Sequence, residues 1–200
     1  MKTVRRTLLV AAIAAFASAA GAENKFDYCL LCHGAAANGN AGIQAPKLAG
    51  MEPWYLTRQL ENFAAGIRGT PAADASGHEM GPVGLRVQQE GTVAEAVMFV
   101  GALAAAKPVP TIAGDVKHGK QLYAACSGCH GAKAEGNQKL QAPALAARSD
   151  WYLVTQLQNF RDGVRGADVR DTYGAQMRAT VTSLPDAKAI TDVVAYINTL

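Results

Sequence analysis

The sequence predicts an all-α fold made of two copies of one domain. The chain repeats itself after a shift of 97 positions, and its apolar residues recur at helical spacing without the alternation typical of strands. Ala is abundant and strand-favouring residues are scarce, which argues against an all-β fold. A length of 200 residues accommodates two domains of about 100 residues each.

The repeat is strongest where residues 29–80 align without a gap with residues 126–177, and 26 of these 52 positions are identical. A period this long indicates a duplicated domain, because solenoid repeats recur about every 20–50 residues. Pro108 and Pro110 favour an extended linker between the copies. The expected limits are a signal peptide at 1–22, a first domain at 23–105, a linker at 106–113 and a second domain at 114–200.

Five helices are expected from apolar periodicity and from the residues that end it. They cover residues 54–65, 93–103, 117–126, 151–162 and 185–197. The segments between them are rich in Gly, Ala, Asn and Pro and are expected to be loops. Few residues lie between the expected cleavage site and Cys29, so the first helix of the first copy should be truncated relative to its counterpart.

The N-terminus has the features of a secretory signal. Lys2, Arg5 and Arg6 precede a short apolar run, and Ala20-Gly21-Ala22 offers small residues for cleavage. Retention as a membrane anchor is the alternative, although the run is shorter than the roughly 20 residues that a bilayer requires. Cleavage removes the excess of basic residues and implies export to the periplasm without stable membrane insertion. The resulting neutral chain gives no indication of nucleic-acid binding.

Both copies contain the sequence C-x-x-C-H, the attachment signature of c-type haem. Two thiols one helical turn apart suit the two vinyl groups of a haem, and the imidazole that follows suits the iron. Disulfides, a zinc site and a redox-active dithiol are alternatives, but none accounts for a histidine directly after both pairs. The sequence therefore predicts two covalently bound c-type haems, attached through Cys29, Cys32, Cys126 and Cys129, with His33 and His130 as axial ligands.

A second axial ligand is expected from methionine. Met80 and Met177 correspond under the 97-residue shift and each lies 47 residues after the motif histidine, whereas Met51 and Met98 have no methionine counterpart. Thioether ligation raises the reduction potential and fills the last coordination site, which suits electron transfer. His78 competes as a ligand for the first haem, but its counterpart is Ala175.

Three further pairs of residues are candidates for the surroundings of the haems. Pro46 and Pro143 follow each motif histidine by 13 residues, where a carbonyl could accept the imidazole proton; the alternative is that proline only shapes the loop. Arg68 and Arg165 are expected to pair with haem propionates. Trp54 and Trp151 are candidates for the same role or for core packing.

Over nearly the whole mature length, the chain resembles a two-haem class I cytochrome c of the cytochrome c4 type. Beyond the two motifs, the resemblance rests on residues 45–50 and 142–147, on residues 152–160 with Gly163 and Arg165, and on Met177. It implies two tandem class I cytochrome c domains packed about a pseudo-twofold axis. It also implies a periplasmic carrier of single electrons that serves terminal oxidases or other respiratory enzymes.

The expected partners are redox proteins such as a terminal oxidase, a cytochrome bc1-type complex or a periplasmic dehydrogenase. A rival function is that of a haem subunit in a periplasmic oxidoreductase, such as a thiosulfate-type dehydrogenase or a peroxidase. Haem catalysis requires an open or displaceable ligand, and two matched methionines argue against it. The sequence therefore favours an electron carrier without substrate chemistry of its own.

Overall fold

The computed structural model describes residues 24–200, so the expected signal peptide at 1–22 lies outside the described residues. The first half contains α1 (Tyr28–His33), the 3-10 helix η1 (Ala41–Ile43), α2 (Pro53–Ala64), α3 (Ala75–Gln89) and α4 (Val93–Gly101). The second half contains α5 (Val116–His130), the 3-10 helix η2 (Gln138–Leu140), α6 (Asp150–Arg161), α7 (Thr172–Val181) and α8 (Ala187–Ile197).

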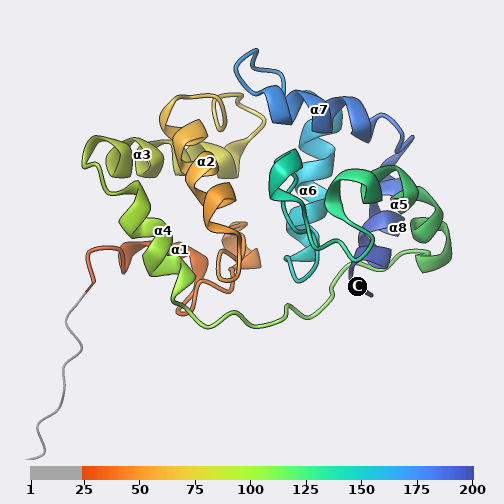
Figure 1. Ribbon diagram of the computed structural model, residues 1–200, viewed down its shortest axis with the longest axis horizontal. Helices are drawn as coiled ribbons and strands as arrows, with labels where there is room; N and C mark the ends of the chain where they lie inside the picture. Colours follow the sequence, from red (N-terminus) through yellow and green to blue (C-terminus); the bar gives the residue numbers. More distant parts are fainter. Residues whose placement is uncertain (1–23) are drawn as a thin grey trace, which may run out of the picture.

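The two halves lie side by side and are joined by an extended segment (Figure 1). Extended pairing within residues 24–200 is limited to two isolated bridges, Asn40 with Ala45 and Asn137 with Ala142. These bridges fall at equivalent positions of the two copies. The all-α prediction is therefore confirmed. Within the same range, no helix is both long and apolar enough to cross a bilayer.

Two helices lie where the sequence predicted loops. The side chains of Asp74 and Asp171 accept hydrogen bonds from the amides of Gly77 and Gly174 and so cap the N-termini of α3 and α7. Gly84 in α3 lies against α2, where an added Cβ would come within 2.8 Å of a backbone carbonyl. The glycines that suggested a loop therefore allow close helix packing, and the loop prediction was wrong here.

The truncated first helix is also evident. α1 has 6 residues and its counterpart α5 has 15. Phe26, which aligns with Tyr123 of α5, is nevertheless buried and packs with Val87 and Ala96. The first half thus keeps the aromatic anchor of this helix without the helical turns that carry it in the second half.

The core of the second half lies between α5 and α8, where Ile190, Val193 and Val194 are almost fully buried. Asp192 is buried beside them and accepts hydrogen bonds from His118 Nδ1 at 2.8 Å and Lys188 Nζ at 2.6 Å. These bonds hold the pKa of Asp192 well below its usual value. His118 of α5 is thereby joined to Asp192 of α8.

The extended segment between the halves is fastened at both ends. Asn38 accepts a hydrogen bond from the amide of Ala106 at 2.9 Å and donates one to the carbonyl of Ala104 at 3.1 Å. At the other end, the buried carboxylate of Asp150 accepts bonds from the amides of Thr111 at 2.5 Å and Ile112 at 2.8 Å. The segment is consequently held along both halves rather than free between them.

Candidate haem sites and the domain interface

The two C-x-x-C-H motifs form the C-terminal ends of α1 and α5. Each histidine is the last helical residue and is buried, and the glycine that follows, Gly34 or Gly131, has φ of +82°. Glycine adopts this conformation without strain, so the chain turns sharply away after the histidine. In both copies, the first cysteine is half-buried and the second is exposed.

The motif histidines are held by proline carbonyls. His33 Nδ1 lies 2.7 Å from the Pro46 carbonyl oxygen, and His130 Nδ1 lies 2.7 Å from that of Pro143. Burial lowers the pKa of both imidazoles, so they are neutral near pH 7. Nδ1 then donates its proton to the carbonyl and Nε2 keeps a free lone pair, which is the form that binds a metal.

Burial affects the thiol of the first cysteine in each motif. No disulfide links the four cysteines. Burial raises the pKa of the Cys126 thiol to about 11 and also raises that of Cys29. A reactive dithiol instead needs a lowered thiol pKa. The first cysteine of each motif therefore lacks the lowered thiol pKa that is typical of a redox-active pair.

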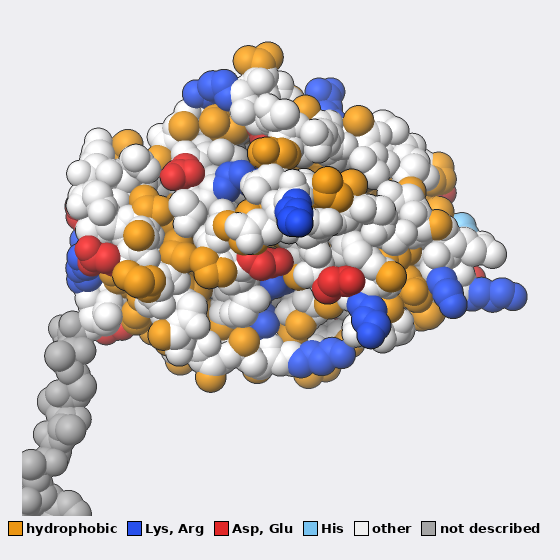
Figure 2. All heavy atoms as spheres, in the orientation of Figure 1, with side chains coloured by type: hydrophobic (Ala, Val, Ile, Leu, Met, Phe, Trp, Pro, Cys, Tyr) orange, Lys and Arg blue, Asp and Glu red, His pale blue; other side chains and the backbone are white. Residues whose placement is uncertain are grey.

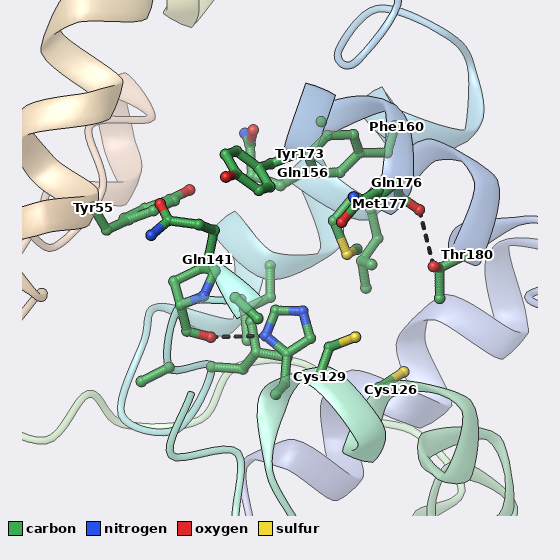
Figure 3. A pocket seen from close by; sticks show the side chains of 18 of the residues that line it. Tyr55, Cys126, Cys129, Gln141, Gln156, Phe160, Tyr173, Gln176, Met177 and Thr180 are labelled. Carbon is green, nitrogen blue, oxygen red and sulfur yellow. Dashed lines mark hydrogen bonds between the residues drawn. The ribbon is translucent and has the colours of Figure 1, made fainter. Parts of the chain in front are cut away.

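A pocket of about 1320 Å³, including its open mouth, lies beside the second motif. Its lining includes Cys126, Cys129 and His130 on one side and Met177 of α7 on the other. Figure 3 shows the Met177 sulfur pointing into the space between α7 and the two thiols. Paired thiols, an oriented imidazole and a facing thioether are the donors that a c-type haem requires, so these residues fit that group.

The structure gives Met80 and Met177 equivalent positions, whereas Met51 both packs in the first half and lines the pocket beside the second motif. Met80 and Met177 are each the sixth residue of α3 and α7, and both are partly buried. Met51 is buried in the hydrophobic cluster of the first half, and Met98 is 65% exposed on α4. His78 is exposed, with its Nδ1 3.2 Å from the carbonyl oxygen of Gly69.

Two buried arginines lie where the halves meet, between α2 and α6. Arg68 donates to Gln59 of its own half and to Tyr152 and Gln156 of the other half, at 2.9–3.0 Å. Arg165 makes the mirror-image set, donating to Gln156 of its own half and to Tyr55 and Gln59 of the other half, at 2.8–3.1 Å. Such reciprocity is the pattern of a twofold interface.

Neither arginine is in direct contact with a carboxylate within the described residues. Within residues 24–200, neither Arg68 nor Arg165 forms an ion pair, and the buried Nε of each has no hydrogen-bond partner. A buried cation without a counter-anion is costly. Two haem propionates would supply the missing negative charge and acceptors, so the interface also fits the cofactor.

The two tryptophans have packing contacts. Trp54 lies edge-on to Tyr55 with ring centroids 5.8 Å apart, and Trp151 lies edge-on to Tyr152 at 6.0 Å. Neither lines the pocket beside the second motif. The tyrosines they support are the ones that hold Arg165 and Arg68, so their effect on the arginines is indirect.

An ion pair at the interface breaks the symmetry. Arg148 lies 3.3 Å from Glu52 of the first half and also donates to the Gly50 carbonyl at 2.9 Å. The other Glu52 oxygen accepts a bond from the amide of Ala144 at 2.6 Å. Neither Arg148 nor Glu52 has a charged counterpart in the repeat. Sequence reasoning missed this pair for that reason.

Sequence reasoning also missed the roles of Gln59 and Gln156. Their signal was present, since both are identical in the repeat and both are polar residues on an otherwise apolar helix face. Arg58 and Asp150, by contrast, align with Thr155 and Pro53, so the repeat does not mark either residue as functional. Their contacts depend on segments that only the folded chain brings together.

Comparison with known proteins shows which family the chain resembles. Its residues 116–200 match the family model described as "Cytochrome c". A cytochrome c4 from Azotobacter vinelandii is 31% identical over 213 residues, covering 100% of this chain and 99% of that protein. A thiosulfate dehydrogenase electron acceptor from Thiomonas intermedia is 33% identical over 178 residues, covering 82% and 79%. The crystal structure of reduced cytochrome c4 from Pseudomonas stutzeri superposes with a TM-score of 0.66 at 27% identity, covering 88% and 95%.

Fold, duplicated motifs and similarity together define a dihaem class I cytochrome c with His/Met-ligated haems. Such a protein is an electron carrier rather than an enzyme. The chain belongs to the cytochrome c4 family.

Proposed function

We propose that the chain carries single electrons in the periplasm between respiratory redox partners, with His33 and Met80 ligating one haem and His130 and Met177 the other. The observation that supports this proposal most directly is that Cys126, Cys129, His130 and Met177 line the same pocket. The repeat assigns the equivalent roles to Cys29, Cys32, His33 and Met80. We also propose domain limits of 23–105 and 114–200, joined by 106–113.

The chain's own residues hold and shield the cofactor in this proposal. The hydrogen bonds that the imidazoles of His33 and His130 donate to the Pro46 and Pro143 carbonyls fix the imidazole orientation. Arg68 and Arg165 pair with propionates at the interface. The bound haem supplies an iron that changes charge by one unit. If His33 and Met80, and likewise His130 and Met177, hold the irons, no coordination site would remain for a substrate.

The partners we propose are a terminal oxidase, a cytochrome bc1-type complex or a periplasmic dehydrogenase. Similarity to proteins named thiosulfate dehydrogenase electron acceptors supports a dehydrogenase as the electron donor. Co-purification from native periplasm under mild cross-linking tests this directly. Recovery of an oxidase without any dehydrogenase would exclude the proposed donor.

Covalent attachment gives the first prediction. Acidified acetone is expected to leave the haem on the protein, and the intact mass should show two haem additions. Replacing Cys126 and Cys129 together by alanine should remove one addition and leave the haem bound through Cys29 and Cys32. Free thiols at the four positions in the mature protein, detected by alkylation, would contradict the proposal.

The second prediction is that the two haems have unequal potentials, with the C-terminal haem higher. Residues 23–113 contain six basic and eight acidic residues, whereas residues 114–200 contain ten and eight. Lys and Arg side chains gather over the C-terminal half at the lower right of Figure 2. At roughly 15 Å in water, four unit charges amount to about 1 kcal/mol, or on the order of 50 mV before salt screening.

Redox titration of Met80→Ala and Met177→Ala variants measures this difference, because each variant reports the haem whose ligand is intact. The short α1 should add to the effect, because fewer helical residues precede the first motif and greater exposure of a haem favours the charged ferric state. Raising the salt concentration should narrow the gap. A higher potential for the N-terminal haem would show that local contacts outweigh net charge.

A further inference from the structure

Arg58 belongs to α2 of the first half, yet its side chain lines the pocket of the second half that holds Cys126, Cys129, His130 and Met177. Its guanidinium donates to Gln141 twice, to the side-chain oxygen at 2.9 Å and to the backbone carbonyl at 3.1 Å. Both bonds cross the domain interface. The charge of Arg58 is thereby fixed beside the C-terminal haem site.

Three aromatic rings hold the same guanidinium. Its central carbon lies 4.9 Å from the ring centre of Tyr173, 5.2 Å from Trp54 and 5.4 Å from Tyr55. Figure 3 shows Tyr55 of the first half extending toward Tyr173 and Gln141 at the side of the pocket. Burial lowers the pKa of Arg58, but arginine titrates so far above neutrality that the group stays charged.

The arrangement exists on one side of the interface only. Arg58 aligns with Thr155, whose hydroxyl bonds the Trp151 carbonyl of its own helix, and Tyr173 aligns with Ser76. Within residues 24–200, the position equivalent to Arg58 therefore supplies no cation to the N-terminal haem site.

The other charges facing this pocket cannot replace Arg58 as the source of asymmetry. Arg165 and Asp171 have the charged counterparts Arg68 and Asp74 in the first half. Glu52 and Arg148 form an ion pair and offset each other. Within residues 24–200, Arg58 itself lies within ion-pair distance of no carboxylate.

We propose that Arg58 of the N-terminal domain raises the reduction potential of the C-terminal haem. Reduction adds an electron, and a fixed positive charge favours the state that has gained it. A partly buried charge acts through an effective dielectric constant of about 20. Its interaction energy with the haem is therefore several-fold larger than that of a fully solvated charge at the same distance. The two domains are thereby unequal electron sites because one lends a cation to the other. This inference rests on the proposed ligation by His130 and Met177.

The test compares Arg58→Gln with Arg58→Lys in the full chain bearing both haems. Each is also made in the Met80→Ala background, where the N-terminal haem titrates at a lower potential and the titration of the C-terminal haem is resolved from it. Arg58→Gln is expected to lower the reduced-to-oxidised ratio of that haem about tenfold at fixed potential, a shift of about 59 mV. Arg58→Lys keeps the charge and should restore most of the potential. Arg86→Gln removes an exposed cation that is bonded to Glu90 and is the matched control. It should leave the potential of the C-terminal haem unchanged.

Haem content and the ferric sulfur–iron charge-transfer band are recorded for every variant. If both are intact and Arg58→Gln leaves the potential unchanged, the role of Arg58 is refuted while the proposed function stands. If Arg58→Lys lowers the potential as far as Arg58→Gln, lost packing and not charge sets it, and the proposal also fails. A wild-type protein without the second haem or its band would instead overturn the proposed function.

Discussion

Replacing Met177 by alanine is expected to remove about half of the ferric charge-transfer band at the near-infrared edge. The thioether of Met177 faces Cys126 and Cys129 across the pocket, so its loss opens the axial position of the C-terminal haem alone. Thioether ligation favours ferrous iron, and we expect the potential of this haem to fall by on the order of 0.2 V, part of the roughly 0.8 V range that axial ligands span. Absorption spectroscopy with redox titration measures both effects.

Met80→Ala should remove the remaining half of the band and lower the potential of the N-terminal haem. Met98→Ala is the control, because this methionine is 65% exposed on α4 and has no methionine counterpart in the repeat. His78→Ala discriminates further. If it changes the spectrum of the first haem and Met80→Ala does not, then Met80 is not the ligand.

The repeat made most of the fold and the candidate haem ligands predictable. Residues that serve shared chemistry had to appear twice, which selected Met80 and Met177 from the four methionines that follow Met1 and identified both C-x-x-C-H motifs. Apolar spacing located α2, α6 and α8 to within a residue or two because each packs one face against a core. Periodicity failed for α3 and α7, whose helices depend on aspartate caps and on close packing at Gly84.

The partners of Arg68 and Arg165 could not be read from the sequence. Sequence reasoning assigned propionates to both, but the folded chain adds Gln59, Gln156 and a tyrosine from the opposite half. Such contacts arise only when two domains meet, and nothing local in the chain encodes the docking. The same holds for Arg58, whose neighbours Gln141 and Tyr173 lie in the other half.

Replacing Asp150 by alanine is expected to destabilise the protein by about 3 kcal/mol. This carboxylate is 2% exposed and accepts bonds from the amides of Thr111, Ile112 and Trp151, from the Thr111 hydroxyl at 2.8 Å and from Asn198 at 3.2 Å. It thus joins the linker, the start of α6 and the C-terminal end of the chain. Chemical denaturation monitored by circular dichroism measures the change. Asp162→Ala is the control, because Asp162 ends the same helix in an exposed position.

The stabilisation that Asp150 provides should decrease at low pH. Burial opposes ionisation of this carboxyl, but the hydrogen bonds from Ile112 and Thr111 outweigh it and hold its pKa below the usual value. A lowered folded-state pKa means that the stabilisation is complete above the unfolded-state pKa of about 3.9 and is lost as the pH falls through the folded-state value. The difference in unfolding free energy between wild type and Asp150→Ala should therefore be full at pH 7 and should shrink as the pH falls below about 4. A difference that stayed constant down to pH 2 would mean that packing around Asp150, and not its charge, fastens the linker.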